Sequence, residues 1–378
     1  MSQDIALYIH FPFCRRRCGY CSFVSYQGRE SDIPQYVKAL NKELLLRFAD
    51  QRVSSIYFGG GTPSLLSPGQ IHEILSVVHS HFAVDQASEV TLEANPGTVD
   101  EIYLTAIRKV GINRLSLGVQ SLDDDELALL GRIHTAAEAR DAVQFAQNAG
   151  FTNLSLDLIY GLPGQTLSSW HRTLDELIGL SPEHISLYPL TLEADAPMRL
   201  AIQRAEVPPI DPDLTADQYE LAQDTLAAHG YHHYEISNWA KGGYECRHNL
   251  VYWHNLPYLG IGVAAHSYID GHRLANTTNL DAYLHAFSSN LPPAWELDEE
   301  IGPELQLSET VILGLRLSEG IGLDDINRRF GIELLRHYEQ QVDVTASLGL
   351  LECASGRVRL TRRGRLLGNE VFWRFLPG

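Results

Sequence analysis

The sequence has 378 residues, of which 44% are hydrophobic and 20% charged, and its formal net charge is −18. This length fits one large α/β domain with a smaller one, and the acidic balance makes nucleic acid a poor candidate partner. No apolar run approaches the length of a membrane span, and five cysteines, three of them clustered, do not form a disulfide framework. Since no charged leader precedes the first apolar strand, we expect a cytoplasmic protein.

Short β-rich runs alternate with amphipathic stretches from residue 5 to about residue 193. The predicted strands are 6–9, 55–58, 89–92, 114–117, 154–157 and 184–187, and the predicted helices lie near 33–48, 68–81, 98–110, 135–149 and 167–180. This alternation indicates parallel βαβ units, which build either an open doubly wound sheet or a partial TIM-type barrel. Both architectures bind ligands at the carboxyl ends of their strands.

The pattern changes after about residue 195. A helix is predicted near 213–229, and an irregular segment rich in Tyr, His, Trp and Gly follows at 231–286. From about residue 300, helices flank a β-hairpin with Gly356 at its turn, which resembles a small winged-helix unit, and we expect Cys353 of this hairpin to be buried. Such units often bind DNA, but the net acidity favours a structural cap. We therefore expect a core at 1–195, a barrel-completing segment at 196–295 and a winged-helix-like cap at 296–378.

Three thiols stand close together in "FPFCRRRCGYCSF", residues 11–23, with the spacing Cys14-x3-Cys18-x2-Cys21. A structural zinc site uses four ligands, but Phe23 cannot ligate a metal and His10 directly continues the predicted first strand. An iron–sulfur cluster held by three thiolates leaves one iron with an open position for an exchangeable ligand. We favour the open cluster, with zinc and purely structural thiols as the alternatives.

Polar residues and glycines follow the ends of the predicted strands. "GGGTP" occupies 59–63, and Glu93, Gln120 and Asp157 end the third, fourth and fifth strands. A carboxylate suits an ammonium ligand, an arginine fork suits a carboxylate, and Asp or Gln suits hydroxyl groups. Each feature also has a simpler explanation, since the glycines could form only a tight turn and Arg132 could be a surface charge.

A three-cysteine motif of this spacing directly after a first strand, with the aromatic Tyr20 beside the last cysteine, resembles the signature of the radical S-adenosylmethionine (SAM) superfamily. The resemblance implies a partial (βα)6 TIM-type barrel, a [4Fe–4S] cluster on the three cysteines and SAM on the open iron. It also implies a set of SAM-binding residues, which are Tyr8, Tyr20, Gly60, Gly61, Thr62, Glu93, Gln120, Arg132 and Asp157. Tyr20 is expected near the adenine, and glycines are expected where a Cβ would block the approach of SAM to the backbone.

"YIHFPFC", "FGGGTPS", "RLSLGVQS" and "DLIYGLPGQT" resemble one branch of that superfamily, which contains oxygen-independent coproporphyrinogen III oxidase and the HemW haem chaperones. The oxidase carries a further cysteine where this chain has Phe23, and a long N-terminal extension where this chain has only a few residues. "HNLVYW" resembles the HNxxYW motif of the chaperones.

The motif supplies the candidate haem-binding residues, His248, Asn249, Tyr252 and Trp253. An imidazole can ligate haem iron, and the two aromatic rings offer flat faces to a macrocycle. Cys246 is an alternative axial ligand. The simpler reading is that these residues only pack the core.

The resemblance therefore implies a haem chaperone that binds haem b and a SAM-ligated [4Fe–4S] cluster and transfers haem to an apo-haemoprotein acceptor, with no nucleic-acid partner. The acceptor can be a membrane protein, so peripheral membrane association stays open. The alternatives are an oxygen-independent coproporphyrinogen III dehydrogenase, which would decarboxylate its substrate through a radical formed by reductive cleavage of SAM, and another radical SAM tailoring enzyme such as a methylase. The sequence leaves open whether SAM is cleaved.

Overall fold

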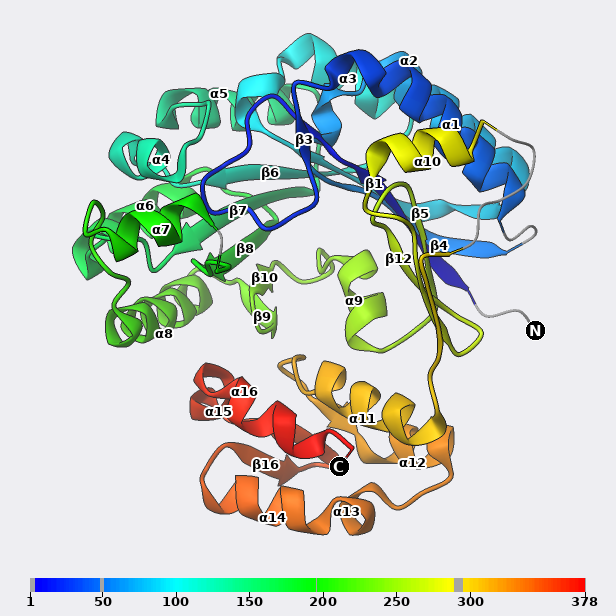
Figure 1. Ribbon diagram of the computed structural model, residues 1–378. Coiled ribbons are helices and arrows are strands. Elements are labelled where there is room, and N and C mark those ends of the chain that lie inside the picture. The colour runs from blue at the N-terminus through cyan, green and yellow to red at the C-terminus, as the bar shows by residue number, and fades with distance from the viewer. Residues whose placement is uncertain (1–3, 48–50, 195, 289–294, 378) are drawn as a thin grey trace.

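The computed structural model describes residues 4–47, 51–194, 196–288 and 295–377, and its larger part is a curved sheet covered by helices on its outer face (Figure 1). The sheet has 12 strands in the order β14-β13-β12-β11-β1-β4-β5-β6-β7-β8-β10-β9. Its centre consists of six parallel neighbours, β1 (Ile5–Phe11), β4 (Arg52–Gly60), β5 (Ala83–Ala94), β6 (Arg114–Gln120), β7 (Leu154–Tyr160) and β8 (His184–Pro189). Among the described strands β14 and β9 form free edges, so the barrel is open.

Each of the six strands is followed by helix. The helices are α1 (Ile33–Leu46), α2 (Pro68–His81), α3 (Glu101–Lys109), α4 (Asp124–Leu130), α5 (Ala136–Asn148), α6 (Leu167–Gly179), α7 (Pro197–Gln203) and α8 (Pro212–Ala228). The strand–helix order confirms the predicted partial (βα)6 barrel. The short helices α4 and α7 were not predicted.

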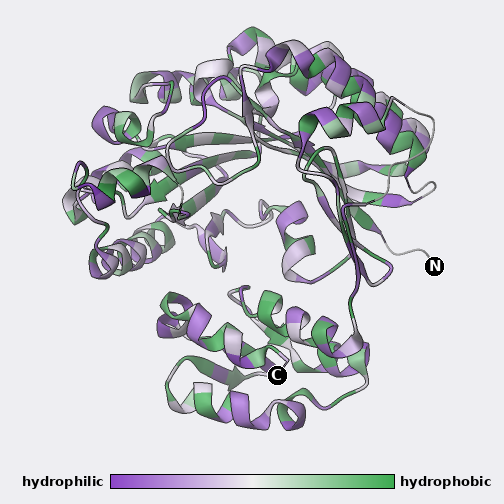
Figure 2. Cartoon of the chain, in the orientation of Figure 1, coloured by the Kyte–Doolittle hydropathy of each residue, from purple (hydrophilic) through white to green (hydrophobic). Residues whose placement is uncertain are grey.

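The two faces of the sheet differ because side chains alternate along each strand. On β6, Leu115, Leu117 and Val119 point outward and are fully buried against the helices, while Arg114 and Ser116 point inward and line a cavity. The covering helices carry both hydrophobic and hydrophilic residues (Figure 2), as amphipathic helices on a sheet require. The outer face is therefore the core, and the inner face is available for polar chemistry.

The segment after α8 adds strands to both edges of the sheet. β9 (His232–Glu235) and β10 (Asn238–Ala240) extend the β8 edge, and β11 (Tyr258–Ile261), β12 (His266–Ile269), β13 (His272–Ala275) and β14 (Leu297–Glu300) extend the β1 edge. Between them α9 (Arg247–Trp253) lies on the inner side of the sheet (Figure 1), and α10 (Leu280–Ala286) packs on α1. The stretch predicted to be irregular thus contains short strands and two short helices, and tertiary pairing rather than local propensity stabilises the strands.

The C-terminal part has a hydrophobic core of its own, from Leu307 to Phe375. It consists of α11 (Pro303–Gly314), β15 (Ile321–Gly322), α12 (Leu323–Phe330), α13 (Leu334–His337), α14 (Glu339–Ser347), β16 (Leu351–Ala354), β17 (Arg357–Leu360), α15 (Arg362–Leu366) and α16 (Gly368–Phe372). This arrangement of helices around a hairpin fits the proposed winged-helix-like cap. The proposed domain boundary at residue 195, and residues 289–294 just before the second boundary, lie outside the described residues.

The hairpin turns at Ser355 and Gly356, which both have positive φ, 52° and 72°, as a tight two-residue turn requires. Cys353 on β16 is exposed, so the expectation that it is buried was wrong. The register pairs Cys353 with Val358, so its side chain is on the same face of the hairpin as the core residues Leu351 and Val358 but is left uncovered there. Within the described ranges, no helix combines the length and apolar character needed to cross a bilayer.

Candidate functional site at the carboxyl ends of the strands

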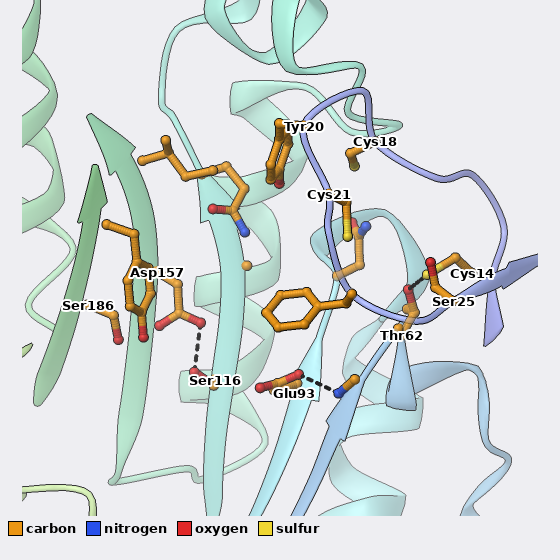
Figure 3. A pocket seen from close by; sticks show the side chains of 18 of the residues that line it. Cys14, Cys18, Tyr20, Cys21, Ser25, Thr62, Glu93, Ser116, Asp157 and Ser186 are labelled. Carbon is orange, nitrogen blue, oxygen red and sulfur yellow. Dashed lines mark hydrogen bonds between the residues drawn. The ribbon is translucent and has the colours of Figure 1, made fainter. Parts of the chain in front are cut away.

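An open cavity of about 400 Å³ lies at the carboxyl ends of the parallel strands, and the loop that carries the three cysteines forms one of its walls (Figure 3). Most of the predicted site residues line this cavity, namely Cys14, Cys18, Tyr20, Cys21, Gly60, Gly61, Thr62, Glu93, Gln120, Arg132, Asp157 and Asn249. Tyr8, His248, Tyr252 and Trp253 do not line it. Tyr8 lies behind the wall, where its ring stacks on Tyr57 and its hydroxyl bonds to His10 Nδ1 at 3.0 Å.

The cysteine loop is tied to the barrel at both ends. β2 (Phe13–Cys14) pairs in parallel with β3 (Tyr26–Gln27), and the Tyr26 hydroxyl donates to the Thr278 carbonyl. At its tip, the Gly19 carbonyl accepts a hydrogen bond of 3.1 Å from the Met198 amide at the start of α7. The loop is therefore held in place before any ligand binds, which lowers the entropic cost of ordering the three thiols.

The three thiols fit a cluster with one open position. They line one cavity, while the structure, over its described residues, brings no three His, Cys, Asp or Glu side chains together as ligands of a single ion. Among the described residues, no histidine and no fourth cysteine line the cavity. His10, the fourth ligand considered for zinc, is buried and uses Nε2 to bond the Val24 carbonyl at 3.1 Å. The donor set thus suits a cluster that spans the thiols and leaves one side facing the cavity.

The surroundings of the thiols suit sulfur with negative charge. Thr62 Oγ1 donates to Cys14 Sγ, and Arg132 Nη1 donates to Cys18 Sγ, both at 3.5 Å. Burial raises the pKa of the Cys14 and Cys21 thiols, so they are protonated in the metal-free protein at neutral pH. Metal binding would deprotonate them outright.

The glycine turn after β4 is required by packing against the cysteine loop. A Cβ at Gly61 would lie 2.7 Å from the Phe13 carbonyl oxygen and 3.0 Å from Cys14 Sγ. A Cβ at Gly60, whose φ is 118°, would lie 2.6 Å from the His10 ring. These clashes give a reason for glycine that is independent of the close approach of SAM expected from the sequence.

Two partly buried carboxyl groups stand on the strands that face the loop. Glu93 accepts hydrogen bonds from the Tyr57 hydroxyl at 2.8 Å and the Gly60 amide at 3.1 Å. Asp157 accepts from the Ser116 hydroxyl at 2.8 Å (Figure 3). Burial raises the pKa of Asp157 and raises that of Glu93 to about 7. Both groups are therefore poised to gain from a cationic or hydroxyl-bearing ligand.

Gln120 and Arg132 complete the rim of the cavity. Gln120 has a φ of 68° at the end of β6, a left-handed conformation that costs of order 1 kcal/mol for a residue other than glycine. Arg132 Nη2 donates to the Gly118 carbonyl at 2.8 Å, but its buried Nε has no partner among the described residues. This arginine is held in position and keeps a donor for a further acceptor.

The HNxxYW motif forms α9, which closes the opposite end of the barrel. His248 is 1% exposed, and its ring nitrogens contact Ser55 Oγ and Tyr252 Oη, both at 2.9 Å. Burial lowers its pKa to about 3, so the ring is neutral. Trp253 instead faces the cap, where Arg316 lies 4.7 Å above its ring. Of the four motif residues only Asn249 reaches the cavity.

Sequence reasoning missed several polar residues of the inner face, including Arg114, Ser116 and Ser186, which also line the cavity. Their signal was present in "RLSLGVQ", because polar or small residues alternate there with apolar ones. A strand of a parallel sheet covered on both faces reads as nearly continuous apolar residues. The alternation therefore indicates an inner face that is not packed against helices.

Comparisons with known proteins agree with this geometry. Residues 8–177 match the family model of the Radical SAM superfamily, and residues 302–367 match the HemN C-terminal domain. Heme chaperone HemW of Bacillus subtilis is 36% identical over 375 residues, covering 98% of both chains, and that of Lactococcus lactis is 34% identical over 377 residues, covering 100% of this chain and 98% of the relative. Coproporphyrinogen III oxidase (HemN) from Escherichia coli, described as a radical SAM enzyme, superposes with a TM-score of 0.86 at 25% identity, covering 99% of this chain and 90% of the oxidase.

Proposed function

The chain belongs to the radical SAM superfamily and, within it, to the HemW family of heme chaperones, and from this premise we propose that it binds haem b and passes it to an apo-haemoprotein. The observation that carries the proposal is the similarity to heme chaperone HemW along nearly the whole chain, cap included. The similarity extends over both the barrel and the cap.

The cavity supports the same proposal by its chemistry. Phe23 and Tyr188 line it and are 64% and 42% exposed, although large aromatic side chains gain free energy by burial. Their faces, next to the apolar Leu190, offer contact to a flat macrocycle. We place the haem at this cavity, which Asn249 of the HNxxYW motif lines.

A [4Fe–4S] cluster on Cys14, Cys18 and Cys21, with SAM on its open iron, belongs to the proposal as well. When bound, the cluster would supply an electron for reductive chemistry on SAM. The residues of this chain would hold SAM by charge and shape: Glu93 would accept from its ammonium, Arg132 would pair with its carboxylate, and Asp157 would accept from the ribose.

The axial ligand of the haem iron, whether His248 or Cys246, would have to leave its present contacts. His248 would lose the bonds to Ser55 and Tyr252. Cys246 is fully buried, its Sγ lies 3.5 Å from Glu89 Oε1, and burial raises its pKa to about 12. Ligation by either residue therefore requires α9 to shift.

The test is an anaerobic titration of the cluster-reconstituted, full-length protein with haem, followed at the Soret band. We expect saturable binding of one haem per chain and transfer of that haem to an added apo-haemoprotein. Absence of saturable binding would overturn the proposal. His248→Ala and Cys246→Ala, titrated in parallel, identify an axial ligand by an altered Soret maximum.

A further inference from the structure

A buried guanidinium without a counter-ion bond stands at the floor of the cavity. Arg114, the first residue of β6, is 2% exposed and lines the cavity together with Ser116, Ser186 and Asn249. It makes no side-chain hydrogen bond and no ion pair with any described residue, and its Nε is buried without a partner. An arginine has five N–H donors, and the one on Nε is here unpaired and away from water, which is costly.

The carboxyl groups whose charge acts on Arg114 are Glu89, Glu93 and Asp157, and each already accepts hydrogen bonds from other donors. Glu89 on the neighbouring strand β5 accepts the His248 amide with Oε1 and the Arg247 amide with Oε2, each at 3.1 Å. Cys246 Sγ also lies 3.5 Å from Oε1. The carboxylate of Glu89 thus serves the first turn of α9, and the donors of Arg114 stay available on the cavity side.

Asn249 at the floor is also able to donate. It lines the cavity and its side-chain amide makes no hydrogen bond within the described structure, whereas the Ser116 hydroxyl already donates to Asp157. A guanidinium beside an amide is a setting that recognises a carboxylate, with two parallel N–H···O bonds available from the arginine.

We propose that Arg114 and Asn249 form a carboxylate-binding subsite on the cavity floor and that, on the proposed haem-binding function, its ligand is a propionate group of haem. The SAM carboxylate is the other carboxylate expected in this cavity. Arg132, which contacts Cys18 at the cluster loop, is the residue expected to receive that group. Haem would thus be oriented with one propionate toward the floor and its ring toward Phe23 and Tyr188.

The test compares wild type with Arg114→Gln in three measurements on the full-length, cluster-reconstituted protein. Arg52→Gln is the control, because it removes an exposed guanidinium from β4, two strands away from β6 and outside the cavity. In the first measurement, haem and haem dimethyl ester are titrated into each protein. We expect Arg114→Gln to weaken haem binding 10- to 100-fold and to leave ester binding unchanged. Equal loss of both ligands, or no loss, would overturn the subsite.

The second measurement separates the two carboxylate sources. Equilibrium dialysis with labelled SAM should give the same dissociation constant for wild type and Arg114→Gln. Weaker SAM binding with unchanged haem binding would assign the carboxylate to SAM and overturn the assignment to haem.

The third measurement uses no haem, so its result does not depend on the proposed haem-binding function. Sodium propionate, at matched ionic strength against sodium chloride, should raise the melting temperature of wild type and Arg52→Gln but not of Arg114→Gln. If wild type does not bind haem but its melting temperature rises with propionate, the subsite stands and the haem-binding function is refuted. Equal responses in all three proteins would refute the subsite. If Arg114→Gln does not fold, Asn249→Ala carries the same comparisons, with an expected loss of about threefold.

Discussion

The two ends of the barrel interior are built in opposite ways from the same strands. At the carboxyl end, polar side chains line an open cavity, and several of them, such as Arg132, keep unpaired donors. At the amino end, α9 lies across the interior, and Glu89, Ser55 and His248 satisfy one another through hydrogen bonds. Saturated hydrogen bonds indicate structure and unsaturated ones indicate a ligand, so the comparison separates residues that hold the barrel from residues that bind.

Loss of a cluster thiol should produce the largest effect at the carboxyl end. We expect Cys18→Ala, like Cys14→Ala or Cys21→Ala, to abolish the reconstituted cluster, because two thiolates leave two irons without protein ligands. Iron and acid-labile sulfide analysis and the visible absorption measure the loss. Cys353→Ala is the control, since that thiol is exposed in the cap. A full complement of iron in Cys18→Ala would contradict the assignment.

Removal of the carboxylate that holds α9 should produce the largest effect at the amino end. Glu89→Ala leaves the Arg247 and His248 amides without their acceptor, and we expect it to lower the free energy of unfolding by about 2–3 kcal/mol. Thermal melts of the cofactor-free protein check the loss. Asp85→Ala on the same strand removes an exposed carboxylate and should cost less than about 1 kcal/mol. Equal melting temperatures for the two variants would show that Glu89 does not hold α9.

The difference between the two ends also explains what the sequence could predict. Parallel strands and amphipathic helices follow local patterns, so all six central strands and helices such as 68–81 were predicted. The cysteine and glycine motifs are contiguous, and they led to the cavity directly. Arg114 and Glu89 owe their roles to neighbours on other strands, and the placement of His248 depends on Ser55, which is 193 residues away. No local pattern indicates such partners.

A pH dependence should distinguish Glu93 at the binding end. Burial raises its pKa to about 7 from an ordinary 4.5, so between these two pH values the folded, ligand-free protein holds a proton that the unfolded chain releases. Its contribution to stability is fully present below pH 4.5 and is lost as the pH rises to about 7, by up to about 3 kcal/mol. A ligand ammonium pairs with the ionised form, and SAM affinity should therefore fall up to about tenfold per unit below pH 7.

Dialysis with SAM at pH 6, 7 and 8 measures this dependence, and Glu93→Gln is the matched variant. It should bind SAM more weakly and with no slope between pH 6 and 8. Its melting temperature should also lack the part of the wild-type decrease that falls between pH 4.5 and about 7. A wild-type affinity that is independent of pH would remove Glu93 as the ammonium partner.

The smallest expected effect tests whether His248 is a structural residue or a ligand of the haem iron. Ser55→Ala removes the partner of His248 Nδ1 and should cost about 1–2 kcal/mol of stability, since both groups are buried. Ser54→Ala is the control, because the hydroxyl of Ser54, the preceding residue on the same strand, donates to the Ile5 carbonyl instead.

The same variants test whether the His248 imidazole ligates the haem iron. If it does, the ring must first leave Ser55, so Ser55→Ala would increase the fraction of protein able to bind haem and would tighten haem binding. Because Asn249 and not His248 faces the cavity, we expect haem affinity to stay within about twofold of wild type in both variants. Tighter binding in Ser55→Ala alone would instead assign the imidazole to the haem iron and place the motif's chemistry at the closed end of the barrel.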